Sequence, residues 1–351
     1  MFTINQLLED ATAKKASDLH LTVGVPPKVR ILGELVDLDY PVLTPDDMRE
    51  LAYSILPESR VLHFEEQGDI DFSYSIRGVG RYRVNVYHQR GSLAATIRLV
   101  AEKIPAADSL GIPKAVQNLV TKKRGLVLVT GPTGSGKSTT LASLIDIINT
   151  NYSYNIITIE DPVEYLHKHK KSIVNQREMG IDTVSYSKAL VASLREDPDV
   201  ILIGEMRDMD TIQTAITAAE TGHLVFSTLH TIGAAPTIDR IIDVFPPYQQ
   251  TQIRSQLAVV LEGIISQQLV TTLDNSARKA AFEVLLTTPA VRNLIRESKT
   301  HQLSSVMQTN KRIGMQTMDD ALYDMYIKGQ IDKEHAISYA QDAVSLGNRL
   351  F

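Results

Sequence analysis

The residues with the strongest chemical signal form a glycine-rich stretch that reads Gly-Pro-Thr-Gly-Ser-Gly-Lys-Ser from Gly131 to Ser138. Glycines allow backbone N–H groups to turn toward phosphate oxygens. In such a loop Lys137 can reach the β- and γ-phosphates, and the Ser138 hydroxyl can bind Mg²⁺. The pattern predicts a site for a nucleoside triphosphate with Mg²⁺, formed by Gly131, Pro132, Thr133, Gly134, Ser135, Gly136, Lys137, Ser138 and Thr139.

This glycine-rich pattern is the P-loop, and a P-loop requires a strand before it and a helix after it. The sequence predicts both. An apolar run at 126–129 precedes it and is typical of a buried strand. After it, Leu141, Leu144, Ile145 and Ile148 recur at helical spacing. A helix that begins here directs unpaired N–H groups and partial positive charge at the phosphates. The plainer interpretation, a glycine turn with an exposed lysine, does not account for this strand and helix.

Two glutamates follow other apolar runs. Glu160 comes after 155–159, and Glu205 comes shortly after 199–203. Helical patterns separate the runs, which predicts a parallel sheet with helices on both faces and with its strand ends along one edge. A carboxylate at that edge can orient or deprotonate an attacking water. Both glutamates are therefore candidate catalytic residues, and a helix cap or a solvated turn is the alternative for each.

His223 and His230 flank a further apolar run, 224–229. A histidine in this position is often a packed or hydrogen-bonded core group. It can also sense the γ-phosphate, because imidazole can donate a hydrogen bond to a phosphate oxygen. The residues alone favour neither of these two interpretations over the other.

The first hundred residues predict a small α+β domain. Alternating segments at 70–76 and 81–87 flank a glycine turn, as in an antiparallel hairpin, and 29–35 is expected to be one strand. Arginines are dense from 77 to 98. They fit a solvated sheet face, and equally a group of charges that meets nucleotide phosphates from outside the P-loop domain.

Length and composition limit the classes of protein to which this chain can belong. The chain has 351 residues, which suggests two or three domains, and no cysteine, which excludes disulfides and cysteine zinc sites. Its first residues do not resemble a signal peptide, and no apolar run approaches the roughly 20 residues that span a bilayer. The net charge of −5 argues against a large nucleic-acid surface, so no nucleic-acid partner is expected.

Prolines, a glycine and small residues at 104–113 are typical of a linker. The expected division is an N-terminal domain at 1–100, a linker at 101–113 and a nucleotide-binding domain at 114–351. Within the last, apolar spacing predicts helices at 249–268 and 315–330, as parts of a C-terminal helical subdomain.

Longer motifs surround these sites. The stretch 157–165 resembles an Asp box, 194–208 resembles an atypical Walker B motif with glycine at 204 in place of aspartate, and 221–231 resembles a His box. With the P-loop, these motifs resemble the PilT-type retraction ATPases of type IV pili, in the secretion ATPase superfamily. The similarity runs over nearly the whole chain.

This resemblance implies an α/β fold, with a PAS-like α+β domain joined to a RecA-like ATPase domain that carries C-terminal helices. It implies a homohexameric ring that hydrolyses ATP with Mg²⁺. By the resemblance Glu160 is the catalytic glutamate, and Glu205 associates with Mg²⁺, partly through water. Arg81, Arg83 and Arg98 are the nearest matches to arginines that complete the site.

The resemblance also implies a motor that disassembles type IV pili and drives twitching motility. Expected partners are an inner-membrane pilus platform protein and a related accessory retraction ATPase, and the expected location is cytoplasmic, at the membrane-bound pilus base. A segment near the C-terminus resembles the one that marks retraction ATPases: Ala290, Val291, Arg292, Asn293, Leu294, Ile295, Arg296 and Glu297.

Three other functions remain open. An assembly or type II secretion ATPase of the same superfamily typically has a longer N-terminal region and a tetracysteine zinc motif, and this chain has neither feature. A nucleic-acid translocase conflicts with the acidic charge. A regulator that binds nucleotide without turnover conflicts with the retention of Lys137, Glu160 and Glu205.

Overall fold

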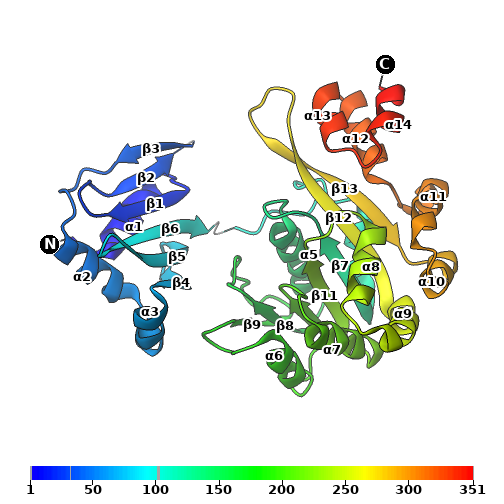
Figure 1. The fold of residues 1–351 in the computed structure, drawn as a ribbon, viewed down its shortest axis with the longest axis horizontal. Coiled ribbons are helices and arrows are strands. Elements are labelled where there is room, and N and C mark those ends of the chain that lie inside the picture. The colour runs from blue at the N-terminus through cyan, green and yellow to red at the C-terminus, as the bar shows by residue number, and fades with distance from the viewer. Residues whose placement is uncertain (1, 32, 101–102, 351) are drawn as a thin grey trace. The chain divides into compact units, whose positions relative to one another are not determined.

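The computed structural model describes residues 2–31, 33–100 and 103–350. The chain divides into two compact units (Figure 1). The first is Met1–Lys103 with Glu164–Leu166, and the second is Ile104–Val163 with His167–Phe351. Of the expected linker at 101–113, residues 101 and 102 lie outside the described residues, and those from Ile104 onward cluster with the second unit.

The first unit contains a six-stranded antiparallel sheet in the order β3-β2-β1-β6-β5-β4. Its strands are β1 (Asp18–Thr22), β2 (Lys28–Ile31), β3 (Glu34–Asp37), β4 (Asp69–Ile76), β5 (Gly80–Gln89) and β6 (Ser92–Val100). The predicted hairpin is confirmed as β4–β5. The single strand expected at 29–35 is wrong, because Gly33 at a φ of +91° turns the chain and Val36 pairs back against Val29.

Helices cover one face of this sheet. They are α1 (Ile4–Ala13), α2 (Pro45–Ile55) and α3 (Val61–Gln67), and Thr3 and Thr44 cap the first two. Side chains alternate along a strand, so Leu19, Val84 and Ile97 are buried in the core with the apolar faces of these helices. The opposite sheet face carries charged and polar groups.

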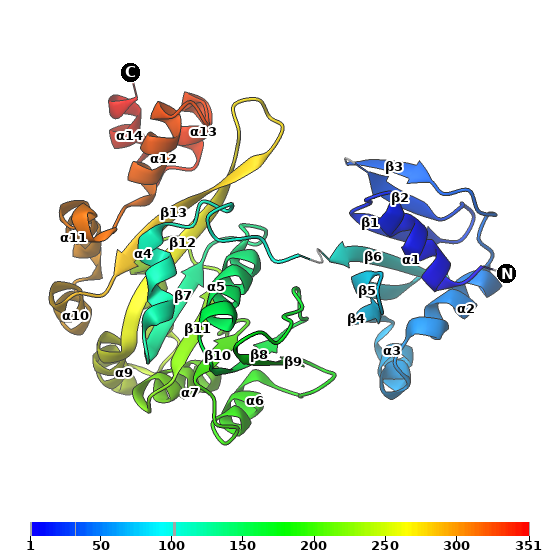
Figure 2. The ribbon, with the colours of Figure 1, turned by 180° about the vertical axis from the view of Figure 1, so that it is seen from behind.

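The second unit contains a seven-stranded sheet in the order β13-β12-β7-β11-β10-β8-β9 (Figure 2). Its strands are β7 (Gly125–Thr130), β8 (Asn155–Glu160), β9 (Ile173–Glu178), β10 (Val200–Ile203), β11 (Leu224–Leu229), β12 (Leu261–Thr271) and β13 (Arg278–Leu286). All neighbouring pairs are parallel except β12–β13. The parallel sheet predicted from the alternating runs is confirmed, and β13 adds an antiparallel edge.

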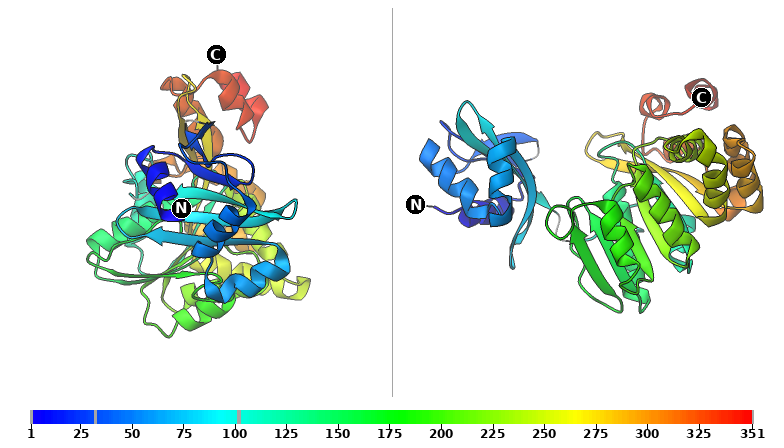
Figure 3. Two further views of the ribbon diagram at one scale, coloured as in Figure 1. Left: turned by 90° about the vertical axis from the view of Figure 1, so that its left-hand side faces the viewer. Right: turned by 60° about the horizontal axis from the view of Figure 1, so that its bottom comes forward.

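Helices cover both faces of this sheet (Figure 3). On one face α4 (Lys114–Gln117) and α5 (Lys137–Asn151) pack over Val127 and Val129. On the other, Leu126 and Leu128 pack with residues of α6 (Tyr186–Ser193), α7 (Met209–Glu220), α8 (Ala234–Asp243) and α9 (Pro247–Val260). The central strands are buried on both faces, which explains why they read as continuous apolar runs.

The helix expected at 249–268 is wrong in its second half. Helix α9 ends at Val260, and β12 begins at Leu261. This strand is buried between β7 and β13, so apolar residues occur on both of its faces. A short apolar run at the start of such a strand cannot be told from a helix by apolar spacing alone.

Within residues 287–350, the C-terminal part contains the α-helices α10 (Pro289–Arg296), α11 (Leu303–Thr309), α12 (Met318–Ile327), α13 (Lys333–Ser338) and α14 (Ala343–Arg349). The helix expected at 315–330 is confirmed as α12, with Leu322 and Met325 in its buried face. Within the described ranges, every helix is too short or too polar to cross a bilayer.

Candidate active site

The glycine-rich loop joins β7 to α5 and passes against β12. A Cβ on Gly131, at a φ of +140°, would lie 2.2 Å from the carbonyl oxygen of Gln267. A Cβ on Gly136, at +89°, would lie 2.9 Å from the Gln267 side-chain nitrogen. Both positions need glycine for conformation and for space, so the loop can keep its backbone N–H groups turned inward.

Lys137 is the first residue of α5, and its ammonium group is held by the loop itself. The Nζ atom donates to the carbonyl oxygens of Gly131 at 2.9 Å and Pro132 at 3.0 Å. The side chain is buried, so the positive charge stays at the loop and not in solvent. Ser138 follows in the first turn of α5, where its hydroxyl can bind a phosphate-associated Mg²⁺.

Gln267 on β12 braces this loop, and the sequence did not indicate it. Its Nε2 donates to the Ser135 carbonyl at 2.7 Å, and its Oε1 accepts from the Thr140 hydroxyl at 2.7 Å. Only 3% of Gln267 is exposed. One side chain therefore ties the loop and α5 to β12. Because its partners are more than 120 residues away, no local pattern could have revealed it.

Glu205 and His230 lie at the carboxyl end of the sheet beside the loop. His230 Nε2 is 3.3 Å from Glu205 Oε1, and His230 Nδ1 is 3.4 Å from the Thr133 hydroxyl. Arg207 Nη2 lies 2.7 Å from Glu205 Oε2. Burial alone would raise the pKa of Glu205, but the Arg207 hydrogen bond and the charges of His230 and Arg207 outweigh it and lower that pKa. These two partners, one at each carboxylate oxygen, favour the charged form of Glu205.

Gly204 in the Walker B motif has a steric explanation. A Cβ at this position would lie 3.0 Å from the Tyr186 hydroxyl and 3.2 Å from the Ile159 carbonyl oxygen. Both contacts are tighter than ordinary van der Waals packing. The close approach of β10 to β8 and α6 therefore favours glycine here, and the acidic group comes one residue later.

Glu160 ends β8, next to Glu205 along the sheet edge. Its Oε1 accepts from the Thr158 hydroxyl at 2.7 Å and from Gln176 Nε2 at 3.0 Å. Strands β11 and β10 separate β8 from β7, which at about 4.8 Å per strand places Glu160 roughly 14 Å along the sheet from the end of β7. Within one chain, Glu160 is thus close to Glu205 and farther from Lys137.

His223 lies at the amino end of β11, on the sheet edge opposite the P-loop of this chain. The length of β11 puts it roughly 20 Å from His230. Its Nδ1 lies 2.9 Å from the Ala218 carbonyl oxygen at the end of α7. The structure therefore brings His230 to the loop of this chain and keeps His223 away from it, in a hydrogen bond to a helix end.

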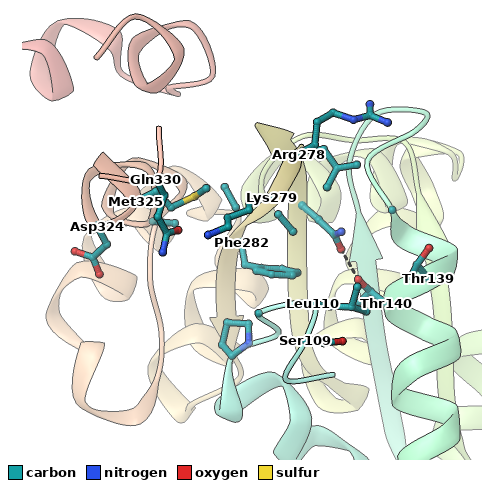
Figure 4. Close-up of a pocket in the computed structure, with 18 of the residues that line it drawn as sticks. Ser109, Leu110, Thr139, Thr140, Arg278, Lys279, Phe282, Asp324, Met325 and Gln330 are labelled. Carbon is teal, nitrogen blue, oxygen red and sulfur yellow. Dashed lines mark hydrogen bonds between the residues drawn. The ribbon is translucent and has the colours of Figure 1, made fainter. Parts of the chain in front are cut away.

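A cavity of about 640 Å³ opens beside the start of α5 (Figure 4). Its walls come from α5, residues 108–113, the β12–β13 ribbon and α12. Thr139, Thr140 and Gln267 join it to the P-loop, while Phe282 and Met325 supply apolar surface. The size and the mixed lining are typical of a small-molecule site. The sequence did not indicate this cavity, since its walls are distant along the chain.

Comparison with known proteins decides the family. The family model described as "Type II/IV secretion system protein" matches residues 96–342. The chain belongs to this family. It is 46% identical over 333 residues to the Pseudomonas aeruginosa protein named "Type IV pilus retractation ATPase PilT", covering 95% of this chain and 96% of that one. It is 43% identical to the Neisseria gonorrhoeae "Twitching motility protein", covering 98% of this chain and 92% of the relative.

A solved structure agrees with this assignment. It is titled "Crystal Structure of the Pilus Retraction Motor PilT and Bound ADP", has 53% sequence identity and gives a TM-score of 0.92. The match covers 97% of this chain and 98% of that one. The mixed α/β fold with two sheets is thus that of a family member with bound nucleotide, and the chain is a P-loop ATPase.

In this family member, the three arginines predicted to complete the site share one face of the first unit's sheet. Arg81 and Arg83 lie two residues apart on β5, and Arg98 lies directly opposite Arg83 on β6. Arg81 donates to Ser73 at 2.8 Å, and Arg98 donates to Asp18 at 3.0 Å. The structure gathers them into one positive group, which local sequence density alone did not establish.

The segment 290–297 forms most of α10, and its two arginines differ. Arg296 is exposed. Arg292 donates to the carbonyl oxygens of Ala258 and Val259 at the end of α9, and its Nη2 lies 3.2 Å from Glu262. Of the two arginines, Arg296 therefore presents exposed charge, whereas Arg292 is partly buried and bonded within the fold, because the end of α9 leaves carbonyls that need donors.

Proposed function

We propose that this chain is a motor ATPase that couples ATP hydrolysis to the retraction of type IV pili. The observation that carries the proposal is the complete phosphate-binding loop on a chain that matches a named retraction ATPase over nearly its full length. The bound ADP of the solved relative supports the same nucleotide class.

The proposed site assigns a separate task to each group of residues. Lys137 and the loop N–H groups bind the β- and γ-phosphates, and the cavity beside α5 takes the nucleoside. Ser138 and Glu205 would hold Mg²⁺, which would neutralise charge on the phosphate oxygens. The described residues contain no cluster of three metal-ligating side chains. A Mg²⁺ site of this kind would need none, because phosphate oxygens and water would supply most of its ligands.

Hydrolysis then needs an oriented water. Its oxygen forms a bond to the γ-phosphorus as the bond from that phosphorus to the β–γ bridging oxygen breaks, giving ADP and phosphate. Glu160 accepts the proton that the water loses. His230 touches the P-loop through Thr133 and the metal-binding group through Glu205, so it is suited to report whether the γ-phosphate is present.

The remaining parts of the proposal concern assembly and location. We propose a homohexameric ring in which Arg81, Arg83 and Arg98 complete the phosphate site. We place it in the cytoplasm at the pilus base, bound to an inner-membrane platform protein and acting with a related accessory ATPase. The distinct domain carrying the arginines, without a nucleotide motif of its own, favours a site completed by assembly.

Deletion and point variants test the proposal together. Deleting the gene should leave pili on the cell surface but abolish their retraction, and Glu160→Gln should fail to restore it. The purified Glu160→Gln protein should bind ATP with near-normal affinity while its kcat falls by about 10²-fold, the scale of general-base loss. Near-normal kcat would reject Glu160 as the base, and a cell without any pili would favour an assembly ATPase instead.

A further inference from the structure

Two side chains that have no assigned role so far, Thr158 and Gln176, donate hydrogen bonds to the Glu160 carboxylate. The Thr158 hydroxyl donates to Glu160 Oε1 at 2.7 Å, and Gln176 Nε2 donates to the same oxygen at 3.0 Å. A carboxylate oxygen can accept two hydrogen bonds at once. Both donors are thus satisfied by one atom, and that atom has a fixed position relative to β8 and β9.

The strand geometry explains why these three residues meet. Thr158 and Glu160 lie two residues apart on β8, so their side chains project from the same face. Gln176 is the register partner of Thr158 on the neighbouring parallel strand β9. Thr158 is fully buried, and a β-branched residue has few χ1 rotamers. The hydroxyl is therefore held in place by the strand itself.

The orientation of the Gln176 amide is also determined. The backbone N–H of His167 donates to Gln176 Oε1 at 2.8 Å. Because that backbone group can only donate, the oxygen of the amide must face it, and the NH₂ group must face Glu160. The Gln176 amide is thus held at its oxygen by His167, just after the Asp box, and at its nitrogen by Glu160, within that box.

We infer that Thr158 and Gln176 are positioning residues that hold the Glu160 carboxylate in the orientation required for proton transfer from water. This inference rests on the proposed role of Glu160 as the general base. An ordinary glutamate side chain samples several rotamers, and a displacement of about 1 Å at a reacting group can cost on the order of 10²-fold in rate. Two donors on one oxygen restrict that sampling without touching the nucleotide.

Removal of either donor should therefore lower kcat and spare nucleotide affinity. Thr158→Val has nearly the same shape but no hydroxyl, and Gln176→Met has a similar length but no amide. We expect each variant to lose about 5- to 20-fold in kcat, with KM for ATP and Kd for ADP within twofold of the parent. Thr158→Ser keeps the hydroxyl and should recover most of the rate. Asn175→Ala, the neighbour of Gln176 on the opposite strand face, is the matched control and should leave both constants unchanged.

A double-mutant comparison separates positioning from a general structural role. If Thr158 and Gln176 act through Glu160, then Thr158→Val and Gln176→Met should have no further effect on kcat in a Glu160→Gln background. An equal loss of kcat in the parent and in the Glu160→Gln background would overturn the inference. So would a wild-type kcat in Thr158→Val and Gln176→Met when Glu160→Gln is inactive. Near-normal kcat in Glu160→Gln itself would instead reject the proposed role of Glu160 as the base, on which this inference rests. Circular dichroism and sedimentation of every variant check that fold and assembly are retained. If Thr158→Val does not fold, Gln176→Met decides the question, because Gln176 lies at a partly exposed position.

Discussion

Arg83 on β5 and Arg98 on β6 lie directly opposite each other in the antiparallel sheet of the first unit. Like charges in this position destabilise a sheet. Arg98 is compensated by Asp18, which is 10% exposed at its side chain, whereas Arg83 Nε lies 3.9 Å from the exposed Asp71. A sheet that keeps two opposed arginines retains positive charge at some cost to stability, which is the expected arrangement for a surface that binds phosphate.

The two arginines should therefore respond differently to substitution. Arg83→Gln relieves like-charge repulsion, so the free energy of unfolding should change by less than about 0.5 kcal/mol. If Arg83 meets phosphate in the assembled ring, kcat should fall by at least about tenfold. Urea unfolding and steady-state ATPase assays check both. Arg77→Gln, at an exposed position next to the hairpin turn, is the control, and an unchanged kcat for Arg83→Gln would remove it from the phosphate site.

Gln267→Leu should weaken nucleotide binding without removing a phosphate ligand. The substitution leaves the Ser135 carbonyl and the Thr140 hydroxyl without their shared partner, and an unpaired buried group costs about 1–3 kcal/mol. Calorimetric titration should show at least a fivefold rise in Kd for ADP. The control is Gln268→Leu, which faces the other side of β12 and loses a bond to the Tyr339 carbonyl. If both variants bind ADP alike, Gln267 does not brace the loop.

The retraction segment should be tested at Arg296, not at Arg292. Arg292→Ala removes donors from two carbonyls at the end of α9, so it should lower the free energy of unfolding by about 2 kcal/mol and confound any motor defect. Arg296→Ala changes an exposed group. We expect it to keep stability, hexamer formation and ATP turnover and to impair pilus retraction in cells. Normal retraction in cells that carry Arg296→Ala contradicts an output role for its side chain.

His167 should make stability depend on pH on the acid side. Burial lowers its pKa to about 4 from the ordinary value of about 6.5. Between these values the unfolded chain binds more protons than the folded chain, so the free energy of unfolding falls as pH decreases from 6.5 toward 4. The loss at pH 5 should be on the order of 1–2 kcal/mol.

His167→Gln should remove most of this acid-side loss. The measurement is the urea midpoint at pH 7 and pH 5 for the parent and the variant. His301→Gln, at an exposed position of the same unit, is the matched control and should keep the parent's pH dependence. A parent whose midpoint is the same at both pH values would contradict the argument.

Local patterns determined the parts of this protein that depend on near neighbours. The phosphate loop, the strand before it and α5 after it could be read directly, because the glycine positions and apolar spacing are local requirements. The strand ends at Glu160 and Glu205 followed from the same logic, since a parallel sheet aligns its carboxyl ends.

The tertiary structure decided what depends on distant contacts. Helix α9 and β12 read as one helix because burial on both faces of a strand imitates helical spacing, and only pairing with β7 and β13 distinguishes them. That pairing brings Gln267 to the loop, as the β8–β9 pairing brings Gln176 to Glu160. The residues and motifs thus indicated the chemistry, while the side chains that orient it became visible only when strands distant in the sequence were placed side by side.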